Sequence, residues 1–109
     1  MTSQTNPDAP TSWEAGLARG SIVLELDESV LDSVQGEHTV LLDYERGEYY
    51  GLNAVATAVW QQLRARRQFP DIVAALTAEY DVADELARRD VAAFLADLRD
   101  RGVVRAHAS

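Results

Sequence analysis

The sequence feature that most constrains the fold is the segment 38–53, which reads HTVLLDYERGEYYGLN. Two runs of apolar and aromatic residues flank the triplet Glu-Arg-Gly at 45–47. The glycine that ends this triplet can supply the left-handed backbone conformation that a three-residue hairpin loop needs. Asn53 follows the second run directly, and asparagine is among the best residues for a helix N-cap. The segment therefore predicts a β-hairpin that leads straight into a helix.

The register expected for this hairpin places Leu42 opposite Tyr50, so that apolar side chains gather on one face. That face would carry Val40, Leu42, Tyr44, Tyr50 and Leu52. A two-residue loop would instead place Leu42 opposite Gly51 and scatter the apolar residues. Because a slip of one residue turns a whole strand over, we prefer the first register. Leu41 and Tyr49 are then expected on the opposite face.

Shorter patterns around the hairpin indicate strands first and helices after them. Alternating apolar residues predict strands at 22–26 and 30–34, and three stretches after residue 53 show helical spacing. The expected core positions are Ala56, Val59, Trp60 and Leu63 in the first helix, Ile72, Val73, Leu76 and Tyr80 in the second, and Leu86, Val91, Phe94, Leu95 and Leu98 in the third. Asp81 or Asp84 is expected to cap the third helix, which should end at Gly102. This order predicts an α+β fold, and it also resembles a helix-turn-helix domain preceded by strands.

The N-terminal end of the chain differs in composition from the rest. Residues 1–20 contain two prolines and several Ser, Thr and Gly residues without periodicity, which predicts a flexible N-terminal tail before a folded domain at 21–106. Trp13 is the exception and is a candidate to dock on the domain. There is neither a basic start followed by an apolar stretch nor an apolar run approaching about 18 residues. We therefore expect a cytoplasmic chain that does not span a membrane.

The charge is strongly acidic, with a net value of −8, and all ten basic residues are arginines. Residues 21–53 hold eight acidic side chains and one arginine. A cationic partner would explain this cluster, and so would simple solubility; both interpretations stay open. Arg88 and Arg89 could face a DNA groove, as in a winged-helix regulator. Five acidic residues share their helix, and nucleic-acid binders usually carry the opposite charge, so DNA binding is the alternative hypothesis.

Residues that carry chemistry are scarce. With no cysteine, disulfides, thiolate metal sites and cysteine nucleophiles are excluded. His38 is expected beside a turn and His107 in a frayed tail, and neither has a helical partner that would complete a zinc site. There is no phosphate-binding glycine loop and no serine in a nucleophile elbow. We therefore expect no catalytic residue, no metal and no cofactor, and the chain is not expected to be an enzyme.

Four stretches carry a resemblance to the PqqD-like family. They are LLDYERGEYYGLN at 41–53, AxxVW at 56–60, FLxxL at 94–98 and RGVV at 101–104, and the resemblance covers about residues 29–105. It implies a recognition element for ribosomally synthesised, modified peptides: a winged helix-turn-helix-like domain of three strands and three helices. Such a domain binds the leader of a precursor peptide and presents it to modifying enzymes. A discrete chain of this length is most similar to the standalone proteins of lasso peptide pathways, whose partner is a separate leader peptidase.

The resemblance also implies where a leader would bind. Adjacent strand residues face opposite ways, so Tyr49 and Tyr50 cannot serve one core, and an edge strand is a template for adding another strand. The leader would add beside the third strand and pack against the third helix. The peptide-binding residues expected on this basis are Glu48, Tyr49, Tyr50, Gly51, Leu52, Val91, Phe94, Leu95 and Leu98.

Three finer expectations concern the helix side of this site, the chemistry of the leader and the N-terminal segment. We expect Val91 and Leu95 to border the groove and Phe94 and Leu98 to lie deeper. The acidic hairpin would suit a cationic leader with apolar anchors. The first 20 to 28 residues have no counterpart in the resemblance, which leaves open an extra strand before the usual three.

Overall fold

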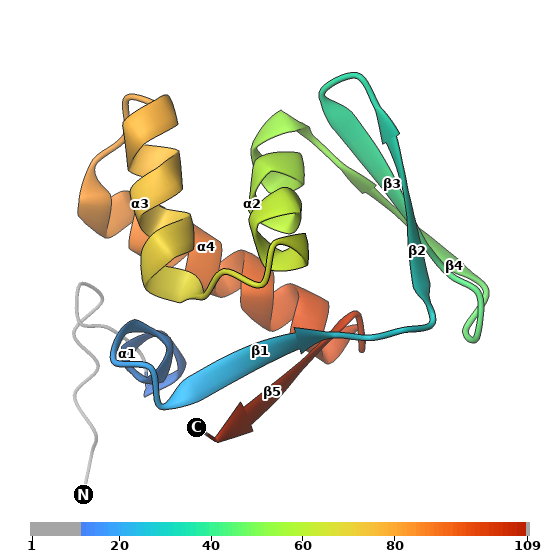
Figure 1. Cartoon of the computed structure of the whole chain (residues 1–109), viewed down its shortest axis with the longest axis horizontal. Coiled ribbons are helices and arrows are strands. Elements are labelled where there is room, and N and C mark those ends of the chain that lie inside the picture. The colour runs from blue at the N-terminus through green and yellow to red at the C-terminus, as the bar shows by residue number, and fades with distance from the viewer. Residues whose placement is uncertain (1–11, 109) are drawn as a thin grey trace, which may run out of the picture.

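A computed structural model describes residues 12–108. Their elements are α1 (Ser12–Ala18), β1 (Ile22–Leu26), β2 (Val30–Gln35), β3 (His38–Asp43), β4 (Glu48–Leu52), α2 (Ala54–Arg64), α3 (Phe69–Glu79), α4 (Asp84–Asp100) and β5 (Val104–Ala108). The strands form two antiparallel sheets, one in the order β2-β3-β4 and one of β1 with β5. Figure 1 shows the three-stranded sheet beside α2, while β1 and β5 lie near α1 and the C-terminal end of α4. The α+β class is thus confirmed.

The β3–β4 hairpin differs from the predicted register by one residue. Leu41 pairs with Tyr50, and Leu42 pairs with Tyr49. The loop has four residues, 44–47, because the Gly47 N–H turns back to the Asp43 carbonyl at 2.7 Å, with Gly47 at a φ of 68°. The prediction from the apolar pattern, which placed Leu42 opposite Tyr50 on the core face, was wrong.

The corrected register decides which face of the sheet meets the helices. Leu41 is fully buried, and Thr39 is buried with it. Tyr50 and Leu52 share this face, as predicted, whereas Tyr49 points the other way and is 73% exposed. Since side chains alternate along a strand, the one-residue change moved Leu42 outward and Leu41 inward.

The helices begin and end mostly where the sequence indicated. The Asn53 side chain accepts a hydrogen bond from the Ala56 N–H at 2.9 Å and caps α2. Pro70 occupies the first turn of α3. At α4 the predicted aspartate caps are wrong: Ala83 holds the N-cap position without a side-chain hydrogen bond. Gly102, at a φ of 78°, follows the end of α4 as expected.

The N-terminal segment contains a helix where a flexible tail was predicted. In α1, Leu17 is buried, and the Trp13 indole N–H donates to the Ala92 carbonyl of α4 at 2.9 Å. The Arg99 guanidinium lies 4.3 Å from the centre of the Trp13 ring. A helix of two turns is not stable by itself, so these contacts with α4 explain it and sequence periodicity could not. Residues 1–11 of the predicted tail lie outside the described residues.

The C-terminal strand was also not predicted. β5 pairs with β1, with Leu24 opposite Ala106 and Leu26 opposite Val104. The strand left open in the sequence analysis therefore belongs to a second sheet. His107 lies within β5, where its Nε2 is 3.0 Å from a Glu25 carboxylate oxygen, so its placement in a frayed tail was wrong. His38 is exposed at the start of β3, as expected.

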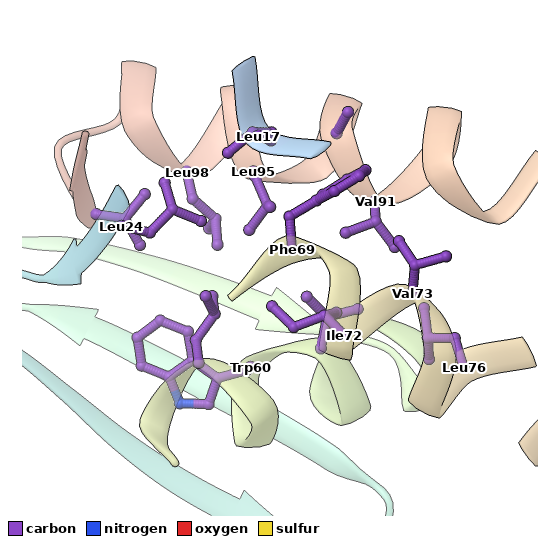
Figure 2. Packing of buried hydrophobic residues seen from close by; sticks show 14 of the residues in the cluster. Leu17, Leu24, Trp60, Phe69, Ile72, Val73, Leu76, Val91, Leu95 and Leu98 are labelled. Atoms are coloured by element: carbon purple, nitrogen blue, oxygen red, sulfur yellow. The ribbon is translucent and has the colours of Figure 1, made fainter. Parts of the chain in front are cut away.

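The hydrophobic core is centred on α4. Figure 2 shows side chains of α3, among them Phe69 and Val73, beside Val91 of α4, with Leu17 of α1 close to Leu95. Leu95 and Phe69 are almost completely enclosed. In residues 12–108, no helix has both the length and the apolar character needed to cross a membrane.

Candidate functional site

β4 forms one edge of the three-stranded sheet, and among the described residues only β3 pairs with it. In an antiparallel pair, alternate residues direct their N–H and C=O groups away from the partner strand. These outward groups of β4 are available to another extended chain. Gly51 keeps this strand accessible, since no atom lies within 4 Å of the place that a Cβ there would occupy.

A groove of about 440 Å³ separates this strand from α4. Its lining residues are Tyr49, Tyr50, Gly51, Leu52, Asn53, Ala56, Phe94, Asp97, Leu98 and Arg101. One wall is thus an edge strand with free backbone groups, and the other is the face of a helix. An extended peptide that paired with β4 would place every second side chain on the α4 side of the sheet.

A second cavity of about 340 Å³ adjoins the groove and is called here the side cavity. Its lining residues are Asn53, Val55, Ala56, Val59, Leu76, Tyr80, Val82, Ala87, Asp90, Val91 and Phe94. The two spaces share Asn53, Ala56 and Phe94. The side cavity is mainly aliphatic and aromatic, which suits a large apolar side chain.

The other end of the groove is charged. The Arg101 Nε lies 3.1 Å from both carboxylate oxygens of Asp97, and its guanidinium lies 4.8 Å from the centre of the Tyr50 ring. The hydrogen bond to Asp97, with a smaller contribution from Tyr50, raises the pKa of Arg101. Arg101 therefore stays charged and partly satisfied, which suits binding and orientation rather than proton transfer.

A polar network connects the sheet to α2 behind the groove. The Trp60 indole N–H donates to an Asp32 carboxylate oxygen at 2.9 Å, and Arg64 forms an ion pair with the same carboxylate. Burial alone would raise the pKa of Asp32, but the hydrogen bonds from Arg64 and Trp60 and the charge of Arg64 lower it overall. Asp32 is thus held as an anion that fixes β2 against the helix.

The structure brings most of the predicted site residues together. Six of the nine line the groove: Tyr49, Tyr50, Gly51, Leu52, Phe94 and Leu98. Val91 lines the side cavity, and Glu48 is exposed at the start of β4. Leu95 is fully buried in the core and cannot border the groove.

The predicted order of depth along α4 is therefore wrong. Phe94 is only half-buried and faces both spaces, while Val91 and Leu95 are enclosed. Leu98 is buried as expected. The buried face of α4 thus holds Val91, Leu95 and Leu98, and the helix is rotated by about one residue from the orientation we assumed.

Four residues of the groove were missed by the sequence analysis: Asn53, Ala56, Asp97 and Arg101. A signal for the last two was present. Phe94, Asp97, Leu98 and Arg101 follow the spacing of i, i+3, i+4 and i+7, which places them on one face of a helix. The prediction from this helix used only its apolar members. In residues 12–108, no group of three or more His, Asp or Glu side chains is arranged to hold a metal ion.

Comparison with known proteins identifies the family. The family model described as coenzyme PQQ synthesis protein D (PqqD) matches residues 38–104. Since this is more than half of the chain, the protein belongs to the PqqD family, as the hairpin and helix motifs had suggested. No curated protein matches the sequence.

Two solved structures are similar to this chain. One is TbiB1 in complex with the TbiA(beta) leader peptide, with 29% identity, a TM-score of 0.74, and coverage of 78% of this chain and 99% of that one. The other is a lasso peptide synthetase B1 complexed with its leader peptide, with 32% identity, a TM-score of 0.69, and coverage of 74% and 95%. Both similar structures therefore contain a leader peptide.

Proposed function

We propose that this protein binds the leader segment of a ribosomally synthesised precursor peptide of the lasso type and presents it to a separate leader peptidase or other modifying enzyme. One observation carries the proposal. The open edge of β4 lies beside a groove walled by α4, in a chain whose two similar structures are both complexes with leader peptides.

The leader would bind as a fourth strand of the sheet, next to β4. Main-chain hydrogen bonds to the outward groups of β4 would supply affinity, and side chains that enter the groove would supply specificity. Phe94 and Leu98 offer apolar surface there, and Arg101 with Asp97 offers a charged end. A leader with spaced apolar residues and a few polar or basic ones fits this arrangement.

On this proposal the protein is a carrier and not a catalyst. The charged groups of the groove, Arg101 and Asp97, already pair with each other, and Arg101 is a fixed cation. The downstream enzyme would supply the chemistry, and its substrate would arrive with the leader immobilised. We place this exchange in the cytoplasm, where ribosomal precursors are made.

The DNA-binding alternative gains no support from the geometry. Arg88, one of the two arginines considered for a DNA groove, forms an ion pair with Asp84 at 2.6 Å on the same helix. The chain carries a net charge of −8, which repels phosphate.

A direct titration tests the proposed function against this alternative. The probes are a fluorescein-labelled synthetic leader, from the lasso precursor encoded nearest to this gene, and a labelled DNA duplex, each at low and near-molar salt. We expect saturable leader binding at both salt concentrations and no DNA binding. DNA affinity that collapses with salt, without peptide binding, would overturn the proposal.

A further inference from the structure

We infer that Arg46, which does not line the groove, is a positioning residue that holds the two walls of the groove together. It connects the β3–β4 loop to the C-terminal end of α4, and these contacts are called here the Arg46 bridge. The inference rests on the proposed function, because it concerns how firmly a leader is held.

The helix end of the bridge is a close fit. The Arg46 Nη1 donates to the carbonyl oxygen of Arg101. A Cβ placed on Gly102 would overlap the guanidinium of Arg46, so the guanidinium lies directly on the glycine that follows α4. The Arg101 carbonyl and the Gly102 backbone thus form a binding site for the planar guanidinium of Arg46, which carries several hydrogen-bond donors.

The loop end of the bridge is held by a buried carboxylate. The Asp43 side chain is 2% exposed. Its Oδ1 accepts a hydrogen bond from the Arg46 backbone N–H at 3.2 Å, and its Oδ2 lies 3.8 Å from the Arg46 Nε. Asp43 ends β3 and pairs with Glu48, the first residue of β4. Arg46 is therefore oriented from the place where the edge strand begins.

The two ends of β4 are held in different ways. The C-terminal end runs directly into α2 through the Asn53 cap. At the N-terminal end, the contacts to α4 come from Arg46 and from the Tyr50 ring against Arg101. Because Arg101 contributes its carbonyl to the bridge and its side chain to the groove, movement of the bridge would move a groove residue.

A structural role and a positioning role predict different results. The side chain of Arg46 is 51% exposed and its Nε lies 3.8 Å from the Asp43 carboxylate, so the ion pair itself should contribute little to the free energy of unfolding. The buried Asp43 carboxylate also keeps its hydrogen bond from the backbone N–H of residue 46 when the side chain is removed. If Arg46 sets the separation of β4 from α4, its loss should instead free the start of the edge strand, which speeds release of a bound peptide.

The test uses the full chain and the labelled leader described above. We expect Arg46→Ala to raise the dissociation rate about tenfold, with a smaller change in association, since mutations at one interface act mainly on dissociation. Arg46→Lys keeps the charge but loses the planar fork, so we expect an intermediate rate. Hydrogen exchange of the β4 amides in the free protein should quicken in Arg46→Ala while urea unfolding stays nearly unchanged.

The matched control is Arg105→Ala, which removes the same charge from the other sheet, where Arg105 pairs with Glu25. The leader should dissociate from Arg105→Ala at the wild-type rate. If wild type does not bind the leader, the proposed function fails. If wild type binds and Arg46→Ala releases the leader at the wild-type rate, only the Arg46 bridge is refuted.

A second variant tests the bridge from its other end. Gly102→Ala would displace the Arg46 guanidinium, and the left-handed backbone at Gly102 adds a cost to stability. In a double-mutant cycle, Gly102→Ala should speed leader release in wild type and add nothing in Arg46→Ala. Fully additive effects on release would show that Gly102 acts independently of Arg46, and would overturn the inference.

Discussion

The two sheets of this protein are built from the same kind of antiparallel pairing but are used differently. The sheet of β1 and β5 joins the two ends of the described chain and buries Leu24 and Val104 in the core. One backbone donor of β1 is also satisfied, because the Leu24 N–H donates to the Gln68 side chain at 3.1 Å. The three-stranded sheet buries only one face and leaves Leu31 and Tyr49 more than half exposed.

From this contrast we expect stability to depend mainly on one sheet and leader binding on the other. The β1–β5 sheet closes the core, so changes there should affect folding. The β2–β3–β4 sheet pairs neighbouring segments, and its β4 edge is open among the described residues. Four variants test whether the two sheets differ in this way.

The largest expected effect lies in the β1–β5 sheet. Leu24→Ala removes a buried side chain and should lower the free energy of unfolding by about 2–5 kcal/mol, measured by urea denaturation. Leader affinity of the protein that remains folded should not change. Leu31→Ala is the control on the other sheet, where the side chain is 55% exposed, and should stay within about 0.5 kcal/mol of wild type. Equal losses of unfolding free energy in Leu24→Ala and Leu31→Ala would show that the two sheets contribute equally to stability.

The next effect lies at the open edge. Gly51→Pro removes a backbone donor and restricts φ, and we expect leader affinity to fall about tenfold or more, which is about 1.4 kcal/mol. Gly51→Ala keeps the N–H and has room for its Cβ, so it should bind nearly as wild type in fluorescence titration.

A modified peptide makes this test independent of the mutant's fold. A leader whose alternate backbone amides are N-methylated should bind wild-type protein at least about tenfold more weakly. Unchanged binding of that peptide, in both methylation registers, would exclude strand addition at β4.

A smaller effect is expected where β2 contacts α2. The pKa of Asp32 is lower in the folded state than its ordinary value of 3.8, so the folded protein binds fewer protons there than the unfolded chain. The resulting stabilisation is complete above pH 3.8 and is lost as pH falls through the lower folded-state pKa. Asp32→Asn should therefore cost under about 1 kcal/mol at pH 7, and the difference should shrink in urea titrations below pH 3.8. A difference that is constant with pH would mean that the charge of Asp32 contributes nothing.

The smallest effect concerns the acidic hairpin. Glu45 and Glu48 are exposed, and each should change leader affinity by well under about 1 kcal/mol. Their neutral variant, Glu45→Gln with Glu48→Gln, should slow association with a cationic leader, and near-molar salt should slow it several-fold by screening. Stopped-flow rates should show dissociation nearly constant. An association rate that does not depend on salt would favour solubility as the role of these charges.

Elements that are stabilised by local contacts could be predicted from the sequence. The hairpin, the Asn53 cap and the glycine after α4 depend on the backbone preferences of a few residues, and each lies where it was predicted. The edge strand with Tyr49 pointing outward follows from alternation alone. The family motifs lie in this same region, which explains why the class of protein could be recognised.

Tertiary structure decided what depends on distant contacts. The hairpin register is a local exception: Asp43 accepts hydrogen bonds from the backbone N–H groups of Arg46 and Gly47 and closes a four-residue loop, and the apolar pattern does not reveal the loop length. The helix α1 and the strand β5 exist through their contacts with α4 and β1, more than 70 residues away along the chain. The rotation of α4 buries Leu95 and leaves Phe94 in the groove, and it depends on the helices α1 and α3 that pack against α4. The spacing of residues along a helix shows which of them share a face. Which part of that face is buried in the core depends on the helices and strands that pack against it.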